Sequence, residues 1–136
     1  MNTMVSVFRG ERMLPDLRGA HWLLRAALAA FIMYQGFSKA PISPDDAASF
    51  GVPVLLWIAA ALGELVAGAA LIFGGFLTNR IGDLITRAGG AMLALIVASV
   101  LVMVYWAPPL ELFLGNQFHL LLLCGGLYFA LRGNAA

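Results

Sequence analysis

The sequence has few charged residues for a chain of its length. Of its 136 residues, 11% are Asp, Glu, Lys or Arg, while 62% are hydrophobic, and the mean hydropathy is +0.91. A soluble domain carries about 25% charged residues, because a small globule exposes a large share of its surface to water. The composition therefore excludes an ordinary soluble domain and predicts an integral membrane protein.

An excess of one charge sign is also missing. Eight Lys and Arg residues are balanced by seven Asp and Glu residues, which gives a net charge of +1. A nucleic-acid-binding protein needs a concentrated basic surface, so nucleic acid is excluded as a partner. The single cysteine, Cys124, belongs to no CxxC pair, which excludes dithiol redox chemistry for the chain acting alone.

The N-terminal segment lacks the long apolar run of a signal peptide. Residues 1–18 contain three arginines and two acidic residues, with no small-residue cleavage site after an apolar stretch. We expect no removable signal peptide, so the first membrane span directs insertion. Residues 1–18 are expected to form a cytoplasmic tail or a helix lying on the inner membrane surface.

Four apolar segments predict membrane spans. A span needs roughly 20 mainly apolar residues, and the segments at about 19–37, 54–76, 85–106 and 113–131 approach this length. The fourth begins with Asn116, Gln117 and His119, ahead of an apolar run that is too short by itself. These three residues form a predicted outer polar cluster at the end of a span. A helix that enters the membrane and returns is the alternative.

The basic residues predict the orientation, because cytoplasmic segments are enriched in Lys and Arg. Those on one side of the predicted spans are Arg9, Arg12, Arg18, Arg80, Arg87 and Arg132, whereas Lys39 lies on the other side. Both termini, including the short tail 133–136, are therefore expected in the cytoplasm of a cell with a bacterial-type inner membrane. Stripes of small residues favour close helix packing. The predicted fold is an all-α, antiparallel four-helix bundle over residues 19–132.

Two ionisable residues lie deep inside the predicted spans. Arg25 and Glu64 would each cost about 2.5–3.5 kcal/mol near the bilayer centre, so each needs a partner. An Arg25–Glu64 ion pair is feasible because an arginine side chain can extend along its helix. Lys39 and Gln35 share one helix face with Arg25.

These four residues, Arg25, Gln35, Lys39 and Glu64, form a predicted intramembrane polar seam, and three interpretations stay open. The seam is a structural ion pair that sets helix register, or a contact with another subunit. Alternatively, it is a pocket for a quinone, a small anion or a proton, with Glu64 as its ionisable group.

The histidines do not predict a haem or metal site. His21 and His119 lie at opposite ends of the predicted bundle, too far apart to bind one haem iron. The outer cluster provides one good ligand, His119, which is too few for zinc or calcium. The sequence therefore predicts no metal, no intrinsic cofactor and no catalytic residue.

Several motifs together resemble the DoxX family of membrane proteins. The matching positions are Arg25, Gly36 and Lys39, then Gly51 and Pro53, then Glu64 and Gly68 with the glycine pair Gly74 and Gly75 before Arg80. The resemblance covers about residues 24–132. It implies a four-helix integral membrane protein, often associated with membrane oxidoreductases, with Arg25, Lys39 and Glu64 as the family's characteristic polar residues.

The chain departs from this family at two places. A histidine is common late in the third span, where this chain has Val104 and Tyr105. A glutamate often opens the fourth span, where this chain has Phe118 and His119. Both changes remove an ionisable group and argue against an independent catalytic activity.

The resemblance implies an accessory subunit that packs against a larger membrane electron-transfer or oxidoreductase complex. Membrane lipid and that complex are then its partners, and the polar seam stabilises the bundle or lines a quinone or lipid site at a subunit interface. One alternative is a quinone-linked oxidoreductase subunit in which Glu64 takes or gives a proton. Another is a small proton-coupled transporter.

Overall fold

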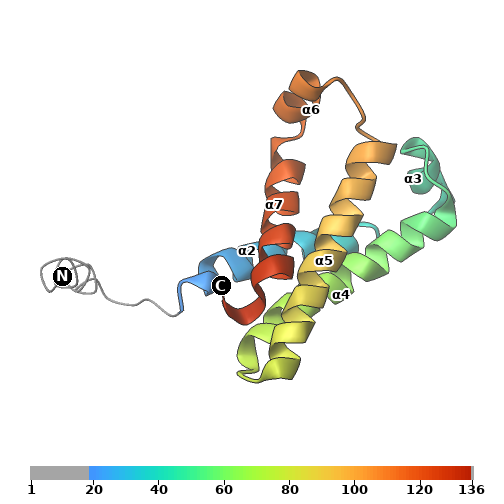
Figure 1. Ribbon diagram of the computed structural model, residues 1–136. Helices are drawn as coiled ribbons and strands as arrows, with labels where there is room; N and C mark the ends of the chain where they lie inside the picture. Colours follow the sequence, from blue (N-terminus) through green and yellow to red (C-terminus); the bar gives the residue numbers. More distant parts are fainter. Residues whose placement is uncertain (1–18, 136) are drawn as a thin grey trace, which may run out of the picture.

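The computed structural model describes residues 19–135. Within that range the chain is helical and contains no strand, which confirms the all-α class. The elements in chain order are α2 (His21–Ser38), α3 (Pro44–Ser49), α4 (Val54–Phe76), α5 (Arg80–Met103), α6 (Pro109–Gly115), α7 (Gln117–Arg132) and the 3-10 turn η2 (Gly133–Ala135) (Figure 1). The predicted N-terminal tail or interfacial helix, with Arg9, Arg12 and Arg18, lies outside the described residues.

Within residues 19–135, two helices have the length and composition of membrane spans. They are α4, with 23 residues, and α5, with 24, and both are strongly apolar. At 1.5 Å per residue each is roughly 35 Å long, enough to cross about 30 Å of hydrocarbon. This finding indicates a membrane protein. The shorter helix α2 has 18 residues and carries Arg25 and Gln35, so its mean hydropathy is lower.

Helix α5 begins five residues before the predicted segment 85–106. The side chain of Asn79 accepts a hydrogen bond from the Gly82 backbone nitrogen at 3.0 Å and caps the helix, which therefore starts at Arg80. An asparagine cap of this kind satisfies one of the free N–H groups at a helix start. The prediction placed the start by apolar composition and missed the cap.

The predicted fourth segment, 113–131, is not one continuous helix. Helices α6 and α7 meet at an angle of 90° and together form either a broken span or a re-entrant loop (Figure 1). Asn116 lies at the break with a non-helical backbone, φ −132° and ψ 37°, and its side chain donates a hydrogen bond to the Leu112 carbonyl. The break leaves α7 with 16 residues, roughly 24 Å of helix.

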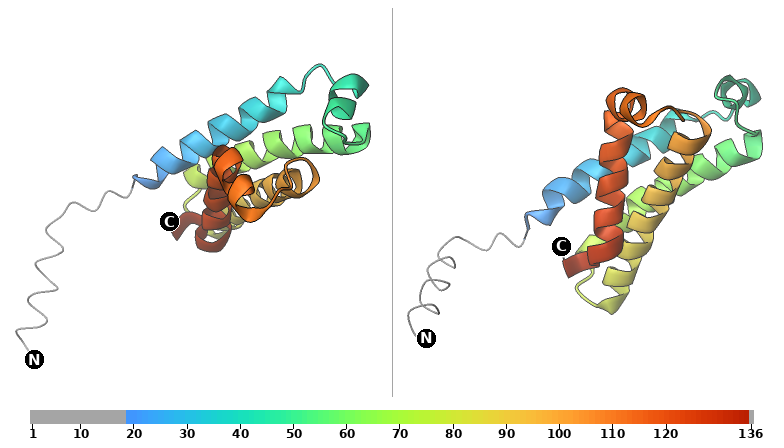
Figure 2. Two further views of the ribbon diagram at one scale, coloured as in Figure 1. Left: turned by 90° about the horizontal axis from the view of Figure 1, so that it is seen from above. Right: turned by 45° about the horizontal axis from the view of Figure 1, so that its top comes forward.

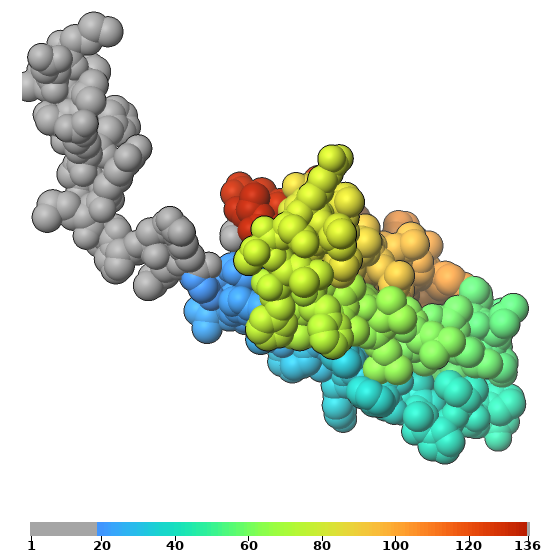
Figure 3. Space-filling view, turned by 90° about the horizontal axis from the view of Figure 1, so that it is seen from below, coloured from blue at the N-terminus to red at the C-terminus, as the bar shows by residue number. Residues whose placement is uncertain are grey.

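Helices that are neighbours along the chain pack against each other. Helix α2 lies on α4, α4 on α5, and α5 on α7, whereas α2 and α7 touch little. Figure 2 shows α2 and α4 side by side, with α5 and α7 together beyond them. Seen from below, the yellow-green region where α4 ends and α5 begins lies at the centre of the molecule's face, next to the C-terminal residues in red (Figure 3).

Glycines allow the backbones to approach at the helix crossings. A Cβ atom on Gly90 of α5 would lie 2.6 Å from the Gly126 carbonyl of α7, and one on Gly36 of α2 would lie 2.9 Å from the Ala61 carbonyl of α4. Close approach through small residues is the usual way for helices to pack in lipid. The predicted packing of helices through small residues is confirmed at Gly90 and Gly126.

Candidate functional site

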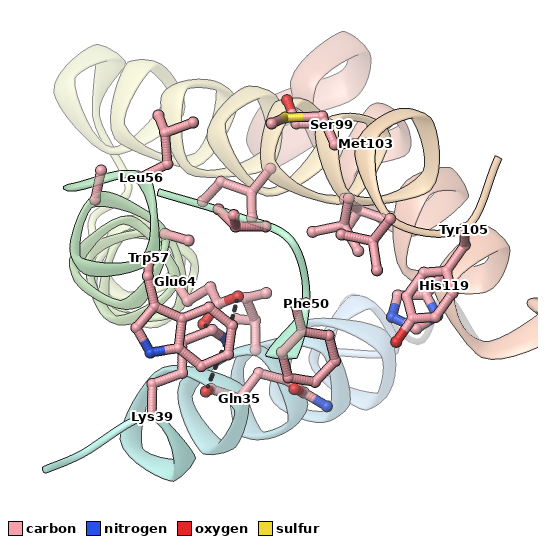
Figure 4. A pocket seen from close by; sticks show the side chains of 18 of the residues that line it. Gln35, Lys39, Phe50, Leu56, Trp57, Glu64, Ser99, Met103, Tyr105 and His119 are labelled. Atoms are coloured by element: carbon pink, nitrogen blue, oxygen red, sulfur yellow. Dashed lines mark hydrogen bonds and ion pairs between the residues drawn. The ribbon is translucent and has the colours of Figure 1, made fainter. Parts of the chain in front are cut away.

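A cavity of about 700 Å³ lies among helices α2, α3, α4, α5 and α7. Its walls are mainly apolar. Its polar lining residues are Gln35, Ser38, Lys39, Asp46, Glu64, Ser99, Tyr105 and His119, and most of them are labelled in Figure 4. Cavities of this size and character commonly hold small molecules, with a few polar groups setting the orientation of the ligand.

An ion pair between Lys39 and Glu64 forms the most polar part of the cavity wall. The Lys39 Nζ lies 3.0 Å from Glu64 Oε1 and 2.8 Å from Oε2. The two side chains are only 11% and 5% exposed. Lys39 also donates to the Gln35 carbonyl at 3.2 Å. Burial of both charges is tolerable because each partner neutralises the other.

Aromatic side chains cover one side of this pair. The Lys39 ammonium lies 5.1 Å from the centre of the Trp57 ring, which is a cation–π distance. Phe50, at the end of α3, stacks on Trp57 with 5.3 Å between ring centres (Figure 4). The polar seam predicted from the sequence did not include Trp57, Phe50 or Asp46. Phe50 and Asp46 reach it because α3 folds over the ends of α2 and α4 (Figure 1).

The predicted ion pair between Arg25 and Glu64 is wrong. Helices α2 and α4 run antiparallel, so Gly36 lies against Ala61 and the start of α2 lies against the end of α4. Arg25 accordingly donates a hydrogen bond to the Leu71 carbonyl and does not pair with Glu64. The prediction compared the depths of the two residues in the membrane and did not include the register between the two helices. In that register, Glu64 lies beside Lys39. The predicted seam is therefore two separate sites.

The second site surrounds Arg25, which is completely buried. Its guanidinium donates to the Leu71 carbonyl at 2.6 Å, to Thr86 Oγ1 at 3.0 Å, to Asn134 Oδ1 at 2.9 Å and to His21 Nδ1 at 3.3 Å. No carboxylate between residues 19 and 135 forms an ion pair with it. Carbonyl groups near the C-terminal end of α4 carry partial negative charge and stabilise a cation there.

Aromatic rings complete the surroundings of Arg25. Its guanidinium carbon lies 4.8 Å from the centre of the Phe129 ring and 5.4 Å from that of Trp22. Each of the three side-chain nitrogens of Arg25 donates at least one hydrogen bond within the protein. This site therefore has a structural character.

Asn134 connects the C-terminal turn to three helices. Besides Arg25, its side chain accepts from Thr86 Oγ1 at 2.7 Å and donates to the Gly74 carbonyl at 2.8 Å. Its backbone nitrogen donates to Asp83 Oδ1 at 2.8 Å. Residues 133–136 were predicted to form a simple cytoplasmic tail. Gly133, at φ 57°, ends α7 and turns the chain back. A glycine after a helix ending in Arg132 is a signal for such a turn.

The predicted outer polar cluster does not form one site. His119 lines the cavity, with its ring 5.1 Å from that of Tyr105 (Figure 4). The Asn116 side chain donates a hydrogen bond to the Leu112 carbonyl, one helical turn earlier in the chain. Gln117 is exposed and does not line the cavity. His119 thus lines the same cavity as Lys39 and Glu64. The described part of the chain has no group of three His, Cys, Asp or Glu residues that could hold a metal ion.

The chain matches no family model, no curated protein and no solved structure. The resemblance to the DoxX family therefore stays a prediction from the motifs around Arg25, Lys39 and Glu64. The residues of the cavity themselves show its chemical character. They combine an apolar wall, one buried ion pair and polar groups from α2, α4, α5 and α7.

Proposed function

We propose that this chain is a DoxX-like accessory subunit of a membrane electron-transfer complex, and that its cavity holds a quinone. The observation that supports this is the cavity of about 700 Å³ with mainly apolar walls. Small-molecule sites typically occupy about 300–1,000 Å³ and are lined in this way. A quinone needs apolar walls for its ring and tail, and polar groups for its two oxygens.

The polar groups of the cavity suit the head of such a ligand. Tyr105 and His119 lie at one side and the Lys39–Glu64 pair at another (Figure 4). A tyrosine hydroxyl and a histidine ring nitrogen both donate hydrogen bonds to carbonyl oxygens. Phe50 and Trp57 add aromatic surface against which a flat ring packs favourably.

The same cavity supports an enzymatic alternative. Glu64 is a carboxylate at the wall of the cavity and is able to exchange a proton with a bound ligand. In that case the chain is a quinone-linked oxidoreductase subunit, and Glu64 takes or gives the proton that accompanies quinone chemistry. An accessory subunit needs only to bind quinone, whereas an oxidoreductase subunit also transfers electrons. A measurement of electron transfer by the isolated chain therefore distinguishes the two functions.

Purification from native membranes in mild detergent tests the proposed function. We expect the chain to co-purify with a larger membrane complex and with quinone, detected by mass spectrometry. Ala60 lines the cavity, and Ala60→Phe should exclude the quinone by filling that space. Leu62, on the same helix, is 59% exposed and outside the lining, so Leu62→Phe is the matched control. Equal quinone content in both variants would contradict the proposal.

The proposed fold in the membrane has four spans, with α6 and α7 together as the fourth, and both termini in the cytoplasm. The cavity then lies toward the outer surface, where α3 connects α2 to α4. This orientation agrees with the positive charges of Arg80 at the start of α5 and Arg132 at the end of α7.

Cysteine labelling tests this orientation. Asp45 in α3 and Thr78 in the α4–α5 link are both exposed. In a Cys124→Ser background, we expect a membrane-impermeant maleimide to label D45C in intact spheroplasts, and T78C only after the membrane is permeabilised. Labelling of T78C in intact spheroplasts with protection of D45C would reverse the orientation, and labelling of both without permeabilisation would contradict the number of spans.

A further inference from the structure

Lys39 has no hydrogen-bond donor left for a ligand. An ammonium group has three hydrogens, and Lys39 has three acceptors within reach. They are the two Glu64 oxygens, at 3.0 and 2.8 Å, and the Gln35 carbonyl, at 3.2 Å. The Trp57 ring lies over the same ammonium. A ligand in the cavity therefore meets a lysine whose hydrogens are already used.

Glu64, in contrast, keeps free acceptor capacity. A carboxylate offers about four lone-pair sites, and across residues 19–135 Lys39 is its only hydrogen-bond donor. The ion pair as a whole is neutral, and Asp46 adds a second carboxylate to the cavity lining. This part of the wall therefore favours a ligand that donates hydrogen bonds and disfavours an anion.

The remaining polar groups do not discriminate between a donor and an acceptor. The Gln35 amide, the Tyr105 hydroxyl and the His119 ring can each donate or accept. The Trp57 Nε1 group is a donor, and it has no partner within the described range, but it is buried under protein atoms where a ligand cannot reach it. Of the two carboxylates in the lining, Asp46 is exposed and Glu64 is buried, so Glu64 is the group expected to decide which form of a ligand binds better.

We infer that the cavity binds the hydroquinone form of its ligand more tightly than the quinone form. The inference rests on the proposed function, since it concerns the same cavity and the same ligand class. A hydroquinone O–H donates to the free lone pairs of Glu64. A quinone carbonyl oxygen at the same position faces the carboxylate oxygens, acceptor against acceptor. No bond is made or broken, because the inference concerns binding only.

Equilibrium dialysis of the full chain in bilayer discs tests this inference. The probes are tetramethyl-1,4-benzoquinone, its hydroquinone kept under anaerobic conditions, and the dimethyl ether of that hydroquinone. The ether has the same ring and no O–H group. We expect the hydroquinone to bind about tenfold more tightly than the quinone, as for a hydrogen bond to a charged acceptor, and the ether to bind no better than the quinone.

The outcomes separate this inference from the proposed function. Equal binding of quinone and hydroquinone, or tight binding of the ether, overturns the inference and leaves the quinone site intact. If none of the three probes binds, the quinone site is wrong and the inference is wrong with it.

A double variant identifies the group responsible. Lys39→Met together with Glu64→Gln removes both charges, so that neither is left unpaired, and replaces the carboxylate with an amide that both donates and accepts. We expect this variant to bind the two forms within about twofold of each other. If the folded double variant keeps the full preference for the hydroquinone, Glu64 is not its source.

Discussion

Lys39→Met is expected to lower the free energy of unfolding by about 3–5 kcal/mol, the usual effect of removing one partner of a buried ion pair. The Glu64 side chain is only 5% exposed and loses its ion-pair partner at 2.8 Å. Methionine fills much of the same space, so the effect comes mainly from the unpaired carboxylate and not from lost packing. Unfolding by increasing SDS in mixed micelles, followed by circular dichroism, measures the change.

The double variant provides the control for this prediction. Lys39→Met with Glu64→Gln should recover most of the lost stability, because no buried charge is left unpaired. Arg25→Met with Glu64→Gln should show no such recovery, since the two side chains belong to different sites and distant substitutions add. Recovery in the second pair but not in the first would show that the ion pairing described above is wrong.

Arg25→Met should also destabilise the protein strongly, by about 3 kcal/mol or more, because several buried polar groups lose their partner together. Arg25 is fully buried and links α2 to the Leu71 carbonyl, to Thr86 and to Asn134. With the guanidinium gone, the C-terminal turn η2 keeps fewer bonds to the helices. We therefore expect carboxypeptidase to digest the C-terminus faster, alongside the lower free energy of unfolding.

Two further variants test the reason for this effect. Arg25→Lys keeps the charge but cannot reach all three elements at once, because an ammonium lacks the planar fork of the guanidinium, so it should restore only part of the stability. Arg132 is exposed, and within the described residues its side chain donates one hydrogen bond, to the Ala135 carbonyl. Arg132→Met should therefore change stability by less than about 0.5 kcal/mol. A loss as large as that of Arg25→Met would mean that charge near the C-terminus, and not the buried contacts, is responsible.

Some local features could be predicted well from the sequence. The apolar segment 54–76 coincides with α4 (Val54–Phe76), because an apolar run of that length, with Glu64 as its one charged residue, forms one helix by local rules. Features that depend on single polar residues were less predictable. The Asn79 cap moved the start of α5, and the break at Asn116 divided the predicted fourth segment into α6 and α7.

The sequence by itself determined the character of this protein: its helices, its apolar surface, and the small number of polar residues that had to find partners inside. Only the tertiary structure decided which partners those are. Glu64 pairs with Lys39, 25 residues away, and Arg25 meets Asn134, 109 residues away. The pattern along a helix sets its faces, but the register between helices follows from backbone contacts such as that of Gly36 with Ala61. That register separates Arg25 from the cavity.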